Sequence, residues 1–180
     1  MWVQNYYAPD PETGALRLRT AQDMPPGVQL VQSPYDGDAR FSTKRETSWI
    51  GYRLHLTETC EEDLPRLITQ VATVPATTNG VEMTAVIQAD LAARDLLPGE
   101  HLLDAGYVLT RYRKRAGVEG TMAQGAQAFG ARRARYRSLR KVQLEHVAIA
   151  AAISLQRLDA WWTETLPATT RISRFAALAA

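Results

Sequence analysis

The chain has 180 residues, with 21 Lys and Arg against 19 Asp and Glu, and one cysteine. This length suits one domain or at most two small ones, and 46% hydrophobic with 22% charged residues excludes wholesale disorder. The lone Cys60 excludes an internal disulfide and a CxxC zinc pair. Because the longest apolar run is residues 147–155 and no signal-peptide pattern opens the chain, we expect a cytoplasmic protein without membrane contact.

Charge is divided unevenly along the chain. Residues 1–104 hold 8 basic and 15 acidic side chains, a net charge of −7, whereas residues 105–180 hold 13 and 4, a net charge of +9. A basic half indicates an anionic partner, nucleic acid first. The alternative is two solvated faces that neutralise each other, and composition alone favours neither.

The first elements are expected to be strands. Residues 1–26 are rich in proline, glycine and acidic residues, which predicts an extended lead-in. The alternation in residues 28–32 predicts a first strand, followed by a turn at 34–38. Residues 49–57 form the clearest strand, with one face made of Ile50, Tyr52, Leu54 and Leu56 and the other of Gly51, Arg53, His55 and Thr57.

A hairpin connection at 58–65 and a third strand over 66–74 follow. Asn79 is a suitable N-cap for a helix over about 81–96, in which Met83, Ile87 and Leu91 recur every four residues and Val86 widens the apolar stripe. The run at 101–107 predicts a buried fourth strand that ends near Asp104. Three antiparallel strands, a helix and a fourth strand parallel to the first open a ribonuclease H-like α/β domain, although other α/β folds begin similarly.

The second half is predicted to be helical. The four glycines between 117 and 130 make a single long helix there doubtful, whereas a strong helix is expected over about 138–164. Its apolar stripe contains Leu144, Val147, Ala148, Ala151, Leu155, Leu158 and Trp162. We expect the Trp161–Trp162 pair to anchor this helix in the core.

Two basic segments, RYRKR at 111–115 and RRARYR at 132–137, interleave arginine with tyrosine. Arginine binds phosphates and tyrosine stacks on exposed bases, so these segments are candidates for DNA contact. A solvated basic face is the alternative. The candidate DNA-binding residues are Arg111, Arg113, Lys114, Arg115, Arg132, Arg133, Arg135 and Arg137.

Three carboxylates are candidates for catalysis. Asp36 follows the expected first strand and Asp104 ends the fourth, and these strands are neighbours in this fold. Like charges held side by side favour a divalent cation, and Glu119 on a packed helix would complete a two-metal site for Mg²⁺ or Mn²⁺. A turn-forming role is the alternative for any single Asp, including those of YDGD at 35–38.

Several long motifs resemble the catalytic core of bacterial insertion-sequence DDE transposases. They are SPYDGDAR and WIGYRLHLTETC, then LLDAGYV, and finally the block from RAGVEGT to LDAWW; together they cover roughly residues 27–178 in the order of that family. The resemblance implies that Asp36, with Asp38 as the fallback, Asp104 and Glu119 bind Mg²⁺ or Mn²⁺. It also implies strand cleavage and transfer at transposon ends.

The chain departs from that family in two places. It begins almost directly at the catalytic core, and only 14 residues separate Asp104 from Glu119, where the family has a long segment with a fifth strand. We therefore expect an incomplete catalytic domain over 27–180, with a sheet half at 27–108 and a basic helical half at 109–180. An active transposase, working as a homo-oligomer or with full-length transposase, is one hypothesis. A non-catalytic DNA-binding fragment that modulates full-length transposase is the second, and a chain that does not fold is the third.

Overall fold

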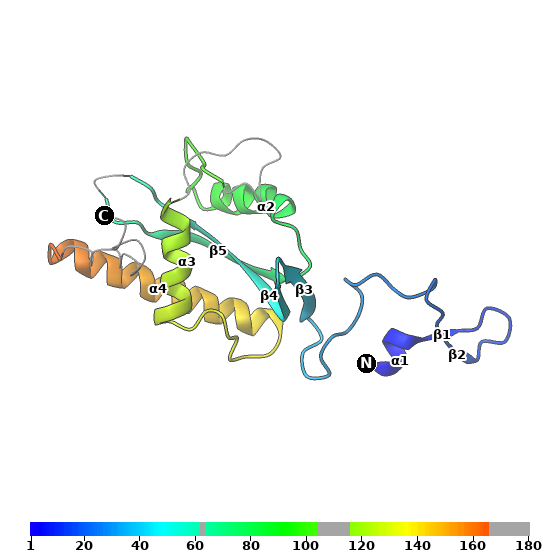
Figure 1. Cartoon of the computed structure of the whole chain (residues 1–180). Helices are drawn as coiled ribbons and strands as arrows, with labels where there is room; N and C mark the ends of the chain where they lie inside the picture. Colours follow the sequence, from blue (N-terminus) through cyan, green and yellow to red (C-terminus); the bar gives the residue numbers. More distant parts are fainter. Residues whose placement is uncertain (62–63, 104–115, 166–180) are drawn as a thin grey trace, which may run out of the picture.

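The computed structural model describes residues 1–61, 64–103 and 116–165, with backbone only for 116–119. The first elements are helix α1 (Trp2–Tyr6) and the short strands β1 (Tyr7–Pro9) and β2 (Leu16–Leu18), which pair as an antiparallel hairpin. The N-terminal stretch therefore has more regular structure than the expected extended lead-in. The hairpin stands to one side of the main body (Figure 1).

A three-stranded antiparallel sheet lies at the centre of the main body. Its order is β3 (Arg40–Lys44), β4 (Thr47–Glu58) and β5 (Ile68–Pro75), so the two strands expected at 49–57 and 66–74 are confirmed. His55 of β4 lies opposite Ala72 of β5, and the connection between the two strands falls at the expected acidic stretch.

The strand expected at 28–32 is wrong, because residues 40–44 take its place in the sheet. The N–H groups of Gln29 and Leu30 donate to the carbonyls of Pro26 and Gly27 in a turn. The N–H and C=O of Val31 are both bound by the side-chain amide of Asn5, at 2.9 and 2.7 Å. These backbone groups are therefore not available to a strand ladder.

Helix α2 (Gly80–Ala93) covers one face of the sheet. Asn79 caps it as expected, since its side chain accepts a hydrogen bond from the Val81 N–H. The predicted stripe of Met83, Ile87 and Leu91 is buried against Ala72 and Val74 of β5. Val86 is 55% exposed, so the stripe is narrower than expected.

Helices α3 (Ala116–Ala128) and α4 (Leu139–Trp162) lie on the other face, as Figure 1 shows. Leu54 and Leu56 of β4 meet Met122 of α3 and Ile149 and Ile153 of α4 there. The predicted long helix at 138–164 is confirmed. The sheet is thus covered on both sides, which makes the face of His55, expected to be polar, a buried one as well.

The side of α4 that faces the sheet differs from the prediction. Its buried residues are Val142, His146, Ala150 and Ile153, whereas Leu144 is 70%, Leu155 66% and Trp162 75% exposed. Polar contacts favour the observed face, because the Gln143 side chain accepts from the Thr73 N–H at 2.7 Å and donates to the Val71 C=O at 3.0 Å. The expectation that Trp161 and Trp162 anchor the helix in the core is therefore wrong.

The described residues form a mixed α/β structure with two antiparallel sheets. Of the expected fourth strand, residues 101–103 adopt no strand, and Asp104 to Tyr107 lie outside the described residues. Within the described ranges, no strand follows β5, and no helix combines the length and apolar character needed to span a membrane.

Candidate functional site

Asp36 lies in the turn that leads into β3, and hydrogen bonds surround its carboxylate. The Tyr52 hydroxyl of β4 donates to its Oδ1 at 2.7 Å and is 2.8 Å from its Oδ2. The N–H of Asp38 donates to Oδ1 at 3.2 Å and that of Ser138 to Oδ2 at 3.1 Å. Three donors, one hydroxyl and two backbone N–H groups, therefore contact a carboxylate that can accept roughly four hydrogen bonds.

The same turn caps helix α4. The Asp38 carboxylate accepts a hydrogen bond from the Leu139 N–H at 2.9 Å, next to the Asp36 contact with Ser138. Ser138 is the N-cap residue but makes no cap with its own side chain, and its φ is 80°. Two carboxylates from another part of the chain therefore satisfy donors that are otherwise unpaired at a helix start, where negative charge is favoured by the helix dipole.

These contacts set the charge state of Asp36 and Tyr52. Burial by itself raises the pKa of Asp36, but the hydrogen bonds from Tyr52, Ser138 and Asp38 outweigh it, so the pKa lies below its ordinary value of 3.8. Burial, together with the neighbouring Asp36 carboxylate, raises the pKa of the Tyr52 hydroxyl above 10.0. At neutral pH the pair is therefore a carboxylate ion bound by a protonated phenol.

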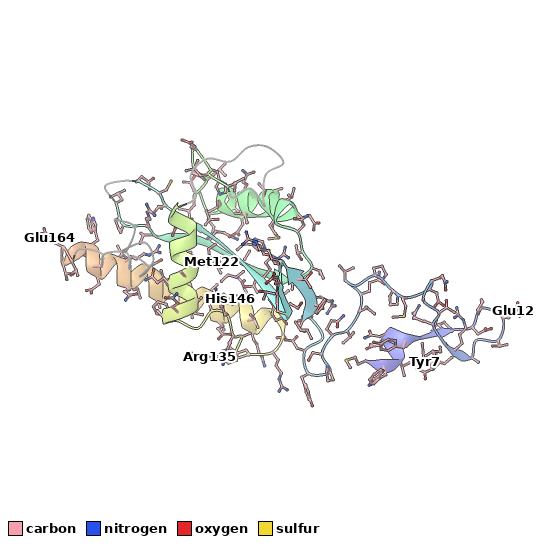
Figure 2. The ribbon with its side chains drawn as sticks, viewed as in Figure 1. Tyr7, Glu12, Met122, Arg135, His146 and Glu164 are labelled. Carbon is pink, nitrogen blue, oxygen red and sulfur yellow. The ribbon has the colours of Figure 1, made fainter. Side chains whose placement is uncertain are left out.

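The basic segment 132–137 runs directly into this capped helix start. Its four arginines, Arg132, Arg133, Arg135 and Arg137, are all exposed. The guanidinium of Arg137 lies 4.8 Å from the centre of the Tyr35 ring, a cation–π contact. Figure 2 shows Arg135 in the loop between α3 and α4; its backbone N–H donates to Glu145 at 3.0 Å.

A cleft of about 410 Å³ joins these features. Its walls include Tyr35 and Asp36, the β4 segment from Trp49 to Tyr52, and Arg132, Tyr136 and Arg137. The structure thus brings Asp36 beside two of the arginines expected to bind DNA. Anionic, cationic and aromatic groups thus line one cavity.

Helix α3 is fixed to the sheet by a separate polar network. Arg157 of α4 donates to Glu58 of β4 at 2.9 Å and to the Thr121 hydroxyl of α3 at 2.7 Å, and Thr121 in turn donates to Glu58. The side chains of Arg157 and Glu58 are only 18% and 8% exposed. Three elements are therefore held by one buried ion pair, two residues along α3 from Glu119.

Comparison with known proteins identifies part of the chain. Residues 78–159 match the family model described as a transposase DDE domain. This part of the chain is therefore similar to a transposase DDE domain. The matched part contains α2, α3 and most of α4, and with them the positions of Asp104 and Glu119, whereas Asp36 precedes it. Neither the curated proteins nor the solved structures include a match to the chain.

The three carboxylates expected to bind a metal ion are described to different extents. Asp36 is placed fully, Glu119 lies in α3 with only its backbone described, and Asp104 lies outside the described residues. Arg111, Arg113, Lys114 and Arg115 of the first basic segment also lie outside them. Among the side chains that the structure describes, no group of three or more His, Cys, Asp or Glu is placed to hold a metal ion.

Asp36 and Asp38 offer the hard oxygen ligands that Mg²⁺ and Mn²⁺ prefer. Their described arrangement uses those oxygens for other bonds, since Asp36 accepts from Tyr52 and two backbone N–H groups and Asp38 accepts from Leu139. A cation at Asp36 therefore competes with these donors for the carboxylate oxygens. The carboxylate oxygens of Asp36 and Asp38 are therefore suitable ligands for a divalent ion. Such an ion competes with the hydrogen bonds that these oxygens accept in the structure.

Sequence reasoning missed the partners of Asp36. Tyr52 was assigned to the apolar face of its strand, and that face does meet α4, but the ring lies where the helix begins and its hydroxyl reaches Asp36. From the sequence, Tyr35, the first residue of YDGD, is also assigned no role. An aromatic residue adjacent to a candidate acidic turn is the only pattern in the sequence that points to it.

Proposed function

We propose that this chain acts in DNA transposition, as the metal-dependent catalytic domain of a DDE transposase. The match of residues 78–159 to a transposase DDE domain carries this proposal. Residues 27–180 are proposed to form an incomplete ribonuclease H-like domain. Its support is the meander β3–β5 followed by α2, and the packing of α3 and α4 from the helical half onto the sheet half.

Asp36, Asp104 and Glu119 are proposed to bind Mg²⁺ or Mn²⁺, and the ion, when bound, activates a water or a 3′-hydroxyl and stabilises the leaving oxygen. Tyr52 holds Asp36 as a carboxylate ion and orients it. The Glu58–Arg157–Thr121 network holds α3, and so the backbone at Glu119, against the sheet. Loss of either support is expected to reduce activity, because metal-dependent sites need fixed ligand geometry.

Arg132, Arg133, Arg135 and Arg137 are proposed to bind the phosphate backbone of transposon-end DNA, together with Arg111, Arg113, Lys114 and Arg115. The exposure of the four described arginines supports this role. Phosphate contacts fix the position of DNA on a protein and carry no direct sequence information. We therefore expect these residues to contribute affinity for any DNA sequence.

A DNA cleavage and joining assay tests the catalytic proposal. The purified chain is incubated with transposon-end DNA from the surrounding element and with Mg²⁺ or Mn²⁺. Nicking that is lost in Asp104→Ala and Glu119→Ala, and retained in the exposed control Asp159→Ala, is the expected result. Absence of nicking, or nicking that persists in Asp104→Ala, contradicts it.

A non-catalytic DNA-binding role, in which the chain modulates full-length transposase, is the second candidate. The hydrogen bonding of Asp36 favours it, since that carboxylate already serves as a helix cap. This role predicts DNA binding without nicking, and an affinity that Asp104→Ala does not change. If Asp104→Ala abolishes both binding and nicking, this second candidate is excluded.

A further inference from the structure

The cleft beside Asp36 is lined by aromatic rings as well as arginines. Contacts between arginines and the phosphates of a double helix do not account for these rings. Its volume of about 410 Å³ lies within the range of small-ligand sites, roughly 300–1,000 Å³. Aromatic rings line it from three separate parts of the chain: Tyr35 before β3, Trp49 in β4 and Tyr136 before α4. A surface that only tracks phosphates does not need rings gathered in a cavity.

The rings are available to a ligand. Tyr35 is 72% and Tyr136 55% exposed, although both line the cleft. Trp49 is half-buried and is oriented by a hydrogen bond from its indole N–H to the Tyr52 carbonyl at 3.3 Å. Flat aromatic ligands gain most from such walls, because every base has a flat face that can stack on an aromatic side chain.

The cleft holds charges of both signs. Arg132 and Arg137 of the basic segment line it together with Asp36, whose carboxylate binds the N–H of Ser138, the residue that follows Arg137. An anionic ligand group is therefore attracted to the arginines and repelled from Asp36. The Arg137 guanidinium already rests on the Tyr35 ring at 4.8 Å, so a cation and an aromatic face are held together at the site.

A ligand with a flat ring system joined to a phosphate satisfies both features, and a nucleotide is such a ligand. In a duplex, the faces of the bases are covered by the neighbouring bases of the stack. Only a base that has left the stack can therefore pack against these rings. We propose that the cleft binds one unpaired nucleotide of a DNA strand, with its base against Tyr35, Trp49 and Tyr136 and its phosphate at Arg132 or Arg137. This proposal rests on the proposed function, because it takes DNA as the partner.

A comparison of two DNA duplexes tests the proposal. Both carry the same sequence, one fully paired and the other with a single unpaired 2-aminopurine nucleotide, and affinities are measured by anisotropy at one salt concentration. We expect about tenfold tighter binding of the duplex with the unpaired nucleotide and quenching of the 2-aminopurine fluorescence on binding.

Variants at exposed rings assign the effect to the cleft without disturbing the core. Tyr35→Ala and Tyr136→Ala are expected to remove most of the preference for the unpaired nucleotide, while Tyr136→Phe retains it. Arg133→Ala is the matched control, since Arg133 belongs to the same segment but does not line the cleft. It is expected to weaken binding of both duplexes equally.

Equal affinity for the two duplexes, or an unchanged preference in both alanine variants, overturns the proposal. Nicking activity with equal affinities would overturn the cleft proposal and leave the proposed function standing. A preference without nicking would support the cleft and contradict the catalytic role. Absence of binding to either duplex at low salt would contradict both.

Discussion

The Ser138 N–H donates to the Asp36 carboxylate at 3.1 Å, although the two residues are 102 positions apart in the sequence. This bond joins the turn before β3 to the start of α4. Because the basic segment 132–137 directly precedes Ser138, the same bond also ties the end of that segment to the turn before β3. The residue proposed to bind a metal and the residues proposed to bind DNA are therefore mechanically linked.

Tyr52→Phe is expected to destabilise the fold by about 1.5–3 kcal/mol, because it removes a hydrogen bond to a charged group. Urea unfolding measures this change. Tyr136→Phe, at a ring that is 55% exposed, is the control and is expected to change the free energy of unfolding by less than about 0.5 kcal/mol. Equal effects of the two substitutions would mean that the Tyr52–Asp36 bond does not stabilise the fold.

Glu58→Gln is expected to lower the free energy of unfolding by about 3–5 kcal/mol, since it leaves the largely buried Arg157 without its counter-charge. The matched control is Asp90→Asn, which breaks the exposed pair with Arg94, whose side chains are 50% and 41% exposed. That pair is expected to contribute less than about 1 kcal/mol. Thermal or urea unfolding measures the loss of stability in both variants. If Glu58→Gln loses no more stability than Asp90→Asn, the network does not stabilise the fold.

Stability is expected to fall between about pH 6.5 and pH 4 because of His55. Burial, aided by the charge of Arg53, lowers the pKa of His55 from 6.5 to about 4. In this interval the unfolded chain binds a proton that the folded chain does not, so the free energy of unfolding decreases as the pH falls. The decrease is measured by urea unfolding at pH 7 and pH 5.

A His55→Gln variant isolates this contribution. Its free energy of unfolding is expected to fall less steeply over the same interval than that of the wild type. His101 and His146, whose pKa values burial also lowers, act in both proteins and cancel in the comparison. Parallel pH dependences in the two proteins would exclude His55 as a source of the loss.

Arg133→Ala is expected to weaken DNA binding. It is also expected to reduce the slope of log K against log salt by about 0.9 for each phosphate that the variant no longer neutralises. Titrations of duplex DNA between low and moderate salt measure this slope. Arg94→Ala, on the other side of the sheet from the basic segment, is the control and is expected to leave the slope unchanged. The same slope in wild type and Arg133→Ala would exclude a phosphate contact at Arg133.

Local sequence patterns predict those helices and strands that have one clear apolar face. The alternation over 49–57 and the four-residue spacing of Met83, Ile87 and Leu91 each have a single apolar face, and both elements formed as expected. Helix α4 has apolar residues all round, so periodicity did not identify its buried side. Gln143 decides the rotation by binding the backbone of β5, and such a contact has no local signature.

The sequence identifies a candidate residue of the site but not the residues that contact it. Asp36 was identified as a candidate from its motif, but its partners Tyr52 and Ser138 come from distant positions and are set by the tertiary fold. The first strand was misplaced at 28–32 because the Asn5 side chain, more than twenty residues earlier, occupies the backbone of Val31. Both outcomes depend on long-range hydrogen bonds.

The contacts that rotate α4 also protect the sheet from other chains. On the outer side of β5, Gln143 occupies the Thr73 N–H and the Val71 C=O, and Arg94 occupies the Thr69 C=O. An open row of such groups is a template for edge-to-edge aggregation. With this edge closed, any strand that extends the sheet, from this chain or from another, must join at β3.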